Sequence, residues 1–229
     1  MQEYFFKLQY SGFGMPKIYL LGGENITKRD AQEVNQQAFN NAGEAPNILV
    51  FSWARASFDK AYDLRKTLFD YFRFLGANTV NTVDYSSKPE EIKQKITQSD
   101  LVYLTGGVPT VLVERLRTMG VDSLLSHFEG IIVGRSAGAL ALCKKCIITC
   151  KPSMEIKIIE CLGLVNLTVK AHYKPGRDEE LKALSKEERI FAVPRGSAVV
   201  YNNGALSFIN SVFLFENGER QTLNQAQEG

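Results

Sequence analysis

The sequence predicts an α/β protein built on a doubly wound, mostly parallel sheet with helices on both faces and antiparallel strands near the C-terminus. In residues 17–142, short apolar runs alternate with stretches of helical periodicity, which is typical of a parallel sheet with crossover helices. Glycine-containing turns follow several of these runs, at the strand ends where such sheets bind ligands. After residue 145 the runs are short and close together, and Asn202-Asn203-Gly204 predicts a hairpin turn.

Local patterns predict each element of the parallel part. Apolar β-branched runs indicate strands, and apolar positions at helical spacing indicate helices, two of which have proline in the first turn. Right-handed crossovers then place helices on both faces of the sheet. We expect strands at Lys17–Leu21, Asn47–Phe51, Asn78–Val83, Asp100–Leu104 and Ile131–Val133, and helices at Ala31–Ala42, Asp59–Leu75, Pro89–Ile96, Pro109–Met119 and Asp122–Phe128.

The C-terminal part is predicted to add short strands and one charged helix, Asp178–Glu188. The tail from Asn217 onward is polar, and we expect it to fray. The strands are expected at Ile147–Thr149, Leu167–Ala171, Ile190–Val193, Ala198–Tyr201, Ala205–Phe208 and Val212–Phe215.

Composition places the chain among soluble globular proteins, because 45% of its 229 residues are hydrophobic and 23% are charged. Without a linker or repeat, we expect a single domain over residues 17–229 after an N-terminal extension over residues 1–16. The net charge of +2 argues against a dedicated nucleic-acid surface. No apolar run is long enough to span a membrane, and the N-terminus has no signal-peptide pattern, so we expect a cytoplasmic protein.

All 4 cysteines lie close together, at Cys143, Cys146, Cys150 and Cys161. The spacing Cys143-x-x-Cys146 suits half of a zinc site or a redox motif, but a second such pair is missing. Cys143 also belongs to an apolar run that we expect to be helical. Buried reduced thiols are therefore expected, with no metal and no cofactor.

A candidate active site lies at Gly134-Arg135-Ser136-Ala137-Gly138. A strand is expected before this segment and a helix after it. Strand, Gly-x-Ser-x-Gly and helix form the context of a nucleophile elbow, in which a sharp turn lifts the serine hydroxyl above the sheet. The N–H of Ala137 would then face an oxyanion formed beside Ser136. The alternative is a glycine-rich connection without chemistry.

A serine nucleophile needs a base, and the chain has 2 histidines. His127 precedes the strand that leads to Ser136, and it therefore lies at the opposite end of that strand. His172 directly follows an expected strand, where a base would sit; the alternative is a surface loop histidine. The Gly106-Gly107 loop can supply a second oxyanion N–H, because glycine lets the backbone approach a substrate closely.

Segments spread over the chain beyond residue 16 carry a resemblance to a known family. They are Tyr19–Gly23, Tyr103–Gly107, Gly134–Ala139, Gly163–Val165 followed by His172-Tyr173, Val193–Ala198 and Phe215–Glu219. Together they resemble the serine-peptidase family of dipeptidase E and cyanophycinase. The resemblance implies a flavodoxin-like fold similar to class I glutamine amidotransferases, and a Ser-His pair that hydrolyses small, often aspartyl, peptides. It makes Ser136 the nucleophile, His172 the base, and Gly107 and Ala137 the oxyanion donors.

The chain departs from this family at the acid of the catalytic triad. Between Pro and Gly, where relatives often have an acid, it has Arg195, and near a second family position it has Cys150-Lys151. Glu155 is the acid nearest to that second position, and Asp178 follows the histidine, so both are candidate replacements. The third member stays unassigned. Without an orienting group, activity falls by orders of magnitude or is lost.

Cationic residues lie in or beside the candidate site segments. They are Arg135, Lys170, Lys174, Arg177 and Arg195. We take Arg135 and Arg195, with the backbone of Gly106, as candidate substrate-binding residues, because guanidinium groups bind carboxylates in a bidentate manner. The alternative is solvated surface charge.

The first hypothesis is therefore a serine-type hydrolase that cleaves small, acidic peptides. The alternative is a catalytically impaired relative that binds a small acidic ligand or a protein partner. A glutamine amidotransferase-like enzyme would need a cysteine at the elbow, which is absent. An esterase of the α/β-hydrolase type would place an acid, Glu155 or Glu160, between serine and histidine. The expected partner is a small peptide, and a homodimer stays an open alternative.

Overall fold

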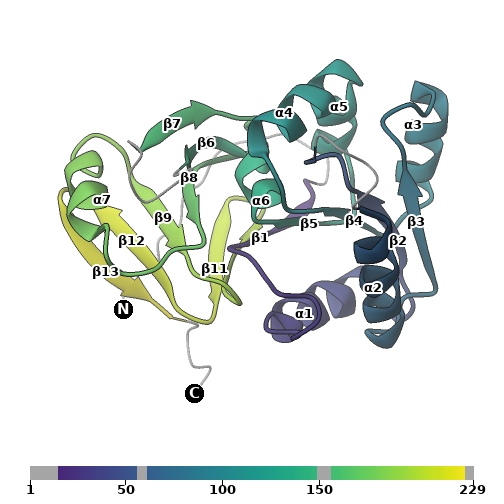
Figure 1. Cartoon of the computed structure of the whole chain (residues 1–229), viewed down its shortest axis with the longest axis horizontal. Coiled ribbons are helices and arrows are strands. Elements are labelled where there is room, and N and C mark those ends of the chain that lie inside the picture. The colour runs from purple at the N-terminus through teal and green to yellow at the C-terminus, as the bar shows by residue number, and fades with distance from the viewer. Residues whose placement is uncertain (1–14, 56–60, 149–155, 225–229) are drawn as a thin grey trace.

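The computed structural model describes residues 15–55, 61–148 and 156–224 of the chain. Within this part the predicted α/β architecture is confirmed, with a parallel sheet covered on both faces (Figure 1). Nearly all of the expected N-terminal extension, residues 1–14, lies outside the described residues, as do Cys150 and Glu155.

The first sheet has seven strands in the order β11-β10-β1-β5-β4-β2-β3. In this order, β1, β5, β4, β2 and β3 run parallel to one another. The two remaining strands, β10 and β11, pair in antiparallel fashion at the other edge. All seven had been predicted. They are β1 (Lys17–Leu21), β2 (Asn47–Phe51), β3 (Thr79–Val83), β4 (Leu101–Leu104), β5 (Ile131–Arg135), β10 (Ala198–Asn202) and β11 (Ala205–Ile209).

Helices cover both faces of this sheet because alternate strand residues point to opposite sides. Ile18 and Leu20 of β1 pack in the core beneath four helices, whereas Tyr19 and Leu21 pack in a second core beneath two. The pair is α1 (Gln32–Ala42) and α2 (Ala61–Phe74), and the four are α3 (Pro89–Thr97), α4 (Pro109–Thr118), α5 (Val121–Ser126) and α6 (Ala137–Leu142). Figure 1 shows the two groups on opposite sides of the strands.

A second, mixed sheet lies beside the first, and the sequence did not separate the two. Its order is β13-β12-β9-β8-β6-β7. Helix α6 contacts β1 and β5 on one side and β6 and β8 on the other, so it lies between the sheets. The strands are β6 (Cys143–Ile148), β7 (Lys157–Glu160), β8 (Val165–Ala171), β9 (Ile190–Val193), β12 (Val212–Glu216) and β13 (Glu219–Leu223), with α7 (Asp178–Leu184) on the outer face (Figure 1).

The C-terminal tail forms β13 as far as Leu223, so the prediction that it frays from Asn217 onward is wrong. Its side chains before Leu223 are polar and exposed, and no apolar alternation marks it as a strand. It pairs with β12 through a tight hairpin in which Asn217 and Gly218 have φ values of 54° and 81°. Positive φ at both turn residues is typical of a type I′ turn. Backbone pairing therefore orders this strand.

The helix after Ser136 ends at Leu142, so Cys143 begins β6 instead of continuing a helical run. Cys143, Cys146 and Cys161 are free and buried, as expected of reduced thiols, and burial raises the pKa of the Cys143 thiol. Among the described residues, no group of three or more His, Cys, Asp or Glu side chains is arranged as a metal site would require. In the same part of the chain, every helix is too short or too polar to cross a membrane.

Candidate active site

Ser136 occupies a sharp turn between β5 and α6. Its φ and ψ are 53° and −108°, a conformation that is strained for a residue with a side chain. Two glycines make the turn possible. A β-carbon at Gly134 would lie 2.6 Å from the carbonyl carbon of Gly138, and one at Gly138 would collide with the carbonyl oxygen of Leu104. The Gly-x-Ser-x-Gly spacing therefore reflects backbone crowding.

His172 approaches Ser136 from the other sheet. It follows β8, and its backbone N–H donates to the carbonyl oxygen of Gly22 at 2.9 Å. The imidazole Nε2 lies 2.6 Å from Ser136 Oγ, within hydrogen-bond distance. The structure thus brings together the two residues that the sequence predicted as a pair.

The glycine pair after β1 forms the support for this imidazole. Gly23 has a φ of 143°, and a β-carbon there would lie 2.5 Å from Nδ1 of His172. A β-carbon at Gly22 would collide with the carbonyl of Pro194. The N–H of Gly196 also donates to the carbonyl of Gly23 at 2.9 Å. The Gly-Gly turn therefore fits between the histidine and the turn that contains Arg195.

The electrostatic surroundings of His172 are cationic. Burial lowers the pKa of this imidazole, and the positive charges of Arg195, Lys170, Arg135 and Lys174 lower it further. In the described residues, no carboxylate forms a hydrogen bond with the ring. The neutral imidazole, which can accept a proton, is therefore the favoured form at neutral pH.

Of the acids considered from the sequence, the two that the structure describes, Asp178 and Glu160, do not orient this ring. Asp178 instead accepts hydrogen bonds from Tyr173 (2.8 Å) and Arg220 (2.8 Å). Glu160 lies opposite Lys145 on an exposed edge of the second sheet. Glu155 falls outside the described residues.

Backbone N–H groups flank Ser136. A β-carbon at Gly106 would lie 3.4 Å from Cβ of Ser136, so the Gly106-Gly107 loop passes directly beside the serine. Gly107 has a φ of 156°, and a side chain there would collide with the carbonyl of Ala54. Ala137 is the first residue of α6. In the described part of the chain, no hydrogen bond occupies the N–H of Gly107 or Ala137.

The comparison with known families adds the decisive observation. The model of peptidase family S51 matches residues 18–209. The chain belongs to peptidase family S51. This confirms the resemblance to dipeptidase E, supports a peptidase, and excludes the esterase and amidotransferase alternatives as the family of this chain.

Solved structures similar to this S51 chain share its fold. A peptidase from an acI-B1 Actinobacterium has a TM-score of 0.69 at 16% identity, and the alignment covers 94% of this chain and 97% of that one. A Listeria monocytogenes EGD-e protein assigned as a peptidase E has a TM-score of 0.64 at 19% identity, with 85% and 98% covered. No curated protein sequence matches the chain.

The candidate site also contains an acid that was not predicted from the sequence. Glu24 directly follows the Gly-Gly turn, and its side chain is fully buried. Its carboxylate accepts hydrogen bonds from Tyr103 Oη and Asn35 Nδ2, each at 2.7 Å, and lies 3.5 Å from Arg135. Its position at the carboxyl end of β1 was the available signal. Glu24 therefore pairs with Arg135, the residue that precedes Ser136.

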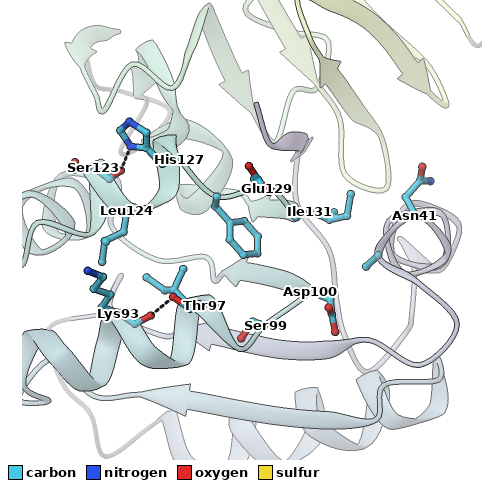
Figure 2. A pocket seen from close by; sticks show the side chains of 14 residues that line it. Asn41, Lys93, Thr97, Ser99, Asp100, Ser123, Leu124, His127, Glu129 and Ile131 are labelled. Carbon is cyan, nitrogen blue, oxygen red and sulfur yellow. Dashed lines mark hydrogen bonds between the residues drawn. The ribbon is translucent and has the colours of Figure 1, made fainter. Parts of the chain in front are cut away.

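The second histidine lies far from Ser136, as predicted. His127 lines a groove of about 660 Å³ at the amino ends of β4 and β5, the opposite edge of the sheet from the serine (Figure 2). Its Nδ1 lies 2.9 Å from the carbonyl of Ser123 and 3.0 Å from Ser126 Oγ. These contacts satisfy the ring locally.

Proposed function

We propose that this S51 chain is a serine hydrolase that cleaves peptide bonds of small, acidic peptides through Ser136 and His172. The single observation that carries the proposal is the 2.6 Å contact between Ser136 Oγ and His172 Nε2 at a strained strand-to-helix turn. A nucleophile and base in hydrogen-bond contact are the geometric signature of covalent catalysis. The turn acts as a nucleophile elbow.

The reaction follows from the positions of these groups. His172 Nε2 takes the hydroxyl proton as Ser136 Oγ attacks the peptide carbonyl. The N–H groups of Gly107 and Ala137 donate to the resulting oxyanion. His172 then returns the proton to the leaving amine, which leaves an acyl-serine. A water molecule, deprotonated by the same imidazole, attacks this ester and releases the acid and free Ser136.

The cations around the site favour an acidic substrate. Arg135 and Arg195 lie beside the serine and the histidine, and both contribute positive charge at the imidazole. A substrate carboxylate would offset this charge and would also favour the imidazolium that forms during attack. We therefore expect the acidic group to contribute to the rate as well as to binding.

One observation favours the second candidate function, a ligand-binding relative with impaired catalysis. The described residues offer no carboxylate to Nδ1 of His172, and Arg195 occupies the position where relatives often have an acid. Without an orienting acid, the imidazole tautomer and the imidazolium are less well stabilised. We therefore expect slow turnover even where Ser136 is reactive.

The test is fluorophosphonate labelling together with hydrolysis of acidic and neutral dipeptides by wild type and Ser136→Ala. The expected result is labelling of Ser136 and hydrolysis that Ser136→Ala abolishes. Ser126→Ala is the matched control, because Ser126 contacts His127, which lies at the opposite edge of the sheet. Labelling that persists in Ser136→Ala would contradict the proposal. No labelling and no hydrolysis by wild type would favour the ligand-binding relative.

A further inference from the structure

A small pocket opens beside Ser136, at the carboxyl ends of β2, β4 and β5. Its volume is about 30 Å³. Three guanidinium side chains, two hydroxyl side chains and a glycine contribute to its wall, together with the apolar residues Ile26, Val50 and Leu68. We call this site the arginine pocket after its polar members, which with the glycine are Ser52, Arg55, Arg65, Thr105, Gly106 and Arg135.

The arginine pocket adjoins the reactive serine. A β-carbon at Gly106 would lie 3.4 Å from Cβ of Ser136 and 3.6 Å from Nε of Arg135. Gly106 therefore lies next to both the serine and an arginine of the pocket. A group bound in the pocket would therefore lie close to a carbonyl that Ser136 attacks.

Positive charge exceeds negative charge around this pocket. Arg65 pairs with Asp84 at 3.3 Å, and Arg135 pairs with Glu24 at 3.5 Å. Among the described residues, the side chain of Arg55 has no ion pair. Three cations thus face two carboxylates, which leaves one positive charge uncompensated. The backbone of Arg55 is held by Arg115, which donates to its carbonyl at 2.8 Å.

Two polar atoms of the pocket residues lack a partner. Ser52 Oγ and Arg65 Nε are buried, and within the described part of the chain neither forms a hydrogen bond. Buried polar groups in folded proteins are nearly always hydrogen-bonded. Two donors without a partner at one pocket therefore indicate that a ligand supplies the acceptor. A carboxylate has two oxygens with about four acceptor sites, which suits this set of donors.

The size of the pocket restricts its occupant. A single water needs roughly 10–15 Å³ of such volume, so the pocket has room for about two oxygen-sized groups. That matches a carboxylate and is small for an aromatic side chain. We propose that the arginine pocket binds a compact carboxylate of the substrate next to the scissile bond, with Glu24 positioning Arg135. The identity of the bound molecule as a substrate rests on the proposed function.

The test measures binding separately from catalysis. Calorimetry with Ser136→Ala compares succinate with succinamate, in which an amide replaces one carboxylate. Succinate is expected to bind about tenfold more tightly, because charge-assisted hydrogen bonds are lost with the amide. Adding Arg65→Gln is expected to remove this preference. Adding Ser52→Ala, which breaks no existing hydrogen bond, is expected to reduce it about fivefold.

Two matched variants separate pocket chemistry from damage to the fold. Arg73→Gln changes an exposed arginine of α2, the helix that carries Arg65, and is expected to keep the preference for succinate. Asp84→Asn removes the partner of Arg65 but keeps the guanidinium, so the preference is expected to persist. Equal binding of the two ligands overturns the inference. So does a loss in Asp84→Asn as large as that in Arg65→Gln.

Hydrolysis then distinguishes this inference from the proposed function. If wild type cleaves peptides but Arg65→Gln and Ser52→Ala leave the ratio of acidic to neutral cleavage unchanged, the pocket inference fails and the hydrolase stands. If Ser136 is unreactive but succinate binding depends on Arg65 and Ser52, the hydrolase fails and the pocket stands. Comparing Asp-Ala with Ala-Asp shows on which side of the bond the carboxylate lies.

Discussion

Ser136 Oγ lies 2.6 Å from His172 Nε2, although the two residues come from different sheets. Ser136 follows β5 of the parallel sheet, and His172 follows β8 of the mixed sheet. Both have a φ of 53°, so each side chain is presented by a strained backbone. The contact therefore depends on how the two sheets pack across α6, and on the Gly22-Gly23 turn that accepts the N–H of His172.

Gly23→Ala is expected to separate the pair. The new β-carbon would lie 2.5 Å from Nδ1 of His172, so the ring has to move. We expect fluorophosphonate labelling of Ser136 to slow about 100-fold, because a displacement of about 1 Å has such an effect on positioned groups. The measurement is the labelling rate at pH 7.5.

Gly43→Ala is the matched control for Gly23→Ala. Gly43 has a similar φ of 127°, but a β-carbon there meets nothing within 4 Å. Both variants should lose about 2 kcal/mol of unfolding free energy to backbone strain. Only Gly23→Ala should lose reactivity. Equal labelling rates in the two variants would show that Gly23 does not support the ring.

Arg195→Gln is expected to move the acid limb of the pH–reactivity profile to a higher pH. The pKa of His172 is lowered by burial and then by cations, among which Arg195 contributes most. The wild-type limb should therefore lie below pH 6.5, the usual pKa of histidine. Removing one cation raises the pKa, and Arg195→Glu should raise it further.

The profile is measured as the labelling rate of Ser136 between pH 4.5 and 8. Lys93→Gln removes a cation at the opposite edge of the sheet and should leave the midpoint unchanged. A wild-type midpoint above pH 6.5, or one that Arg195→Glu does not shift, contradicts the electrostatic assignment.

The same lowered pKa makes stability depend on pH. Because the folded pKa of His172 is below the unfolded value, the unfolded chain binds more protons between the two values. The contribution is fully present above about pH 6.5 and is lost as pH falls through the folded pKa. His172→Gln should therefore show a smaller loss of urea stability between pH 7.5 and pH 5 than wild type. If His172→Gln loses as much stability as wild type between pH 7.5 and pH 5, other groups determine the pH dependence of stability.

The parallel strands could be predicted closely because each is a buried apolar run with its own local signal. The predicted bounds of β1, β2 and β9 agree with the structure. Strand β13 could not be predicted, because its side chains are polar and its order comes from pairing with β12. The division into two sheets was missed for a related reason. An apolar run indicates a strand but not which neighbour it pairs with.

The serine and histidine could be predicted because each directly follows a strand, and the chain has few histidines. Glu24 could not be predicted in the same way. Its role arises from Asn35, Tyr103 and Arg135, which are distant in sequence and meet only in the fold. The arginine pocket was missed for the same reason, since β2, α2, β4 and β5 each contribute to it.

Glu24→Gln tests this buried network directly. The amide removes the charge that faces Arg135, whose side chain is 13% exposed, and leaves a partly buried cation without its partner. Breaking a buried ion pair costs about 3 kcal/mol of unfolding free energy. We also expect Arg135 to lose its fixed position, so succinate binding by the Ser136→Ala protein should weaken about tenfold.

Glu91→Gln is the control for Glu24→Gln, because Glu91 pairs with Lys95 at 2.8 Å on the surface of α3. Exposed pairs of this kind contribute about 0.5 kcal/mol or less. Urea unfolding should therefore separate the two variants by more than 2 kcal/mol. If Glu24→Gln is as stable as Glu91→Gln, the carboxylate is not needed to balance Arg135. If it is destabilised but binds succinate normally, Glu24 supports the fold and does not position the arginine.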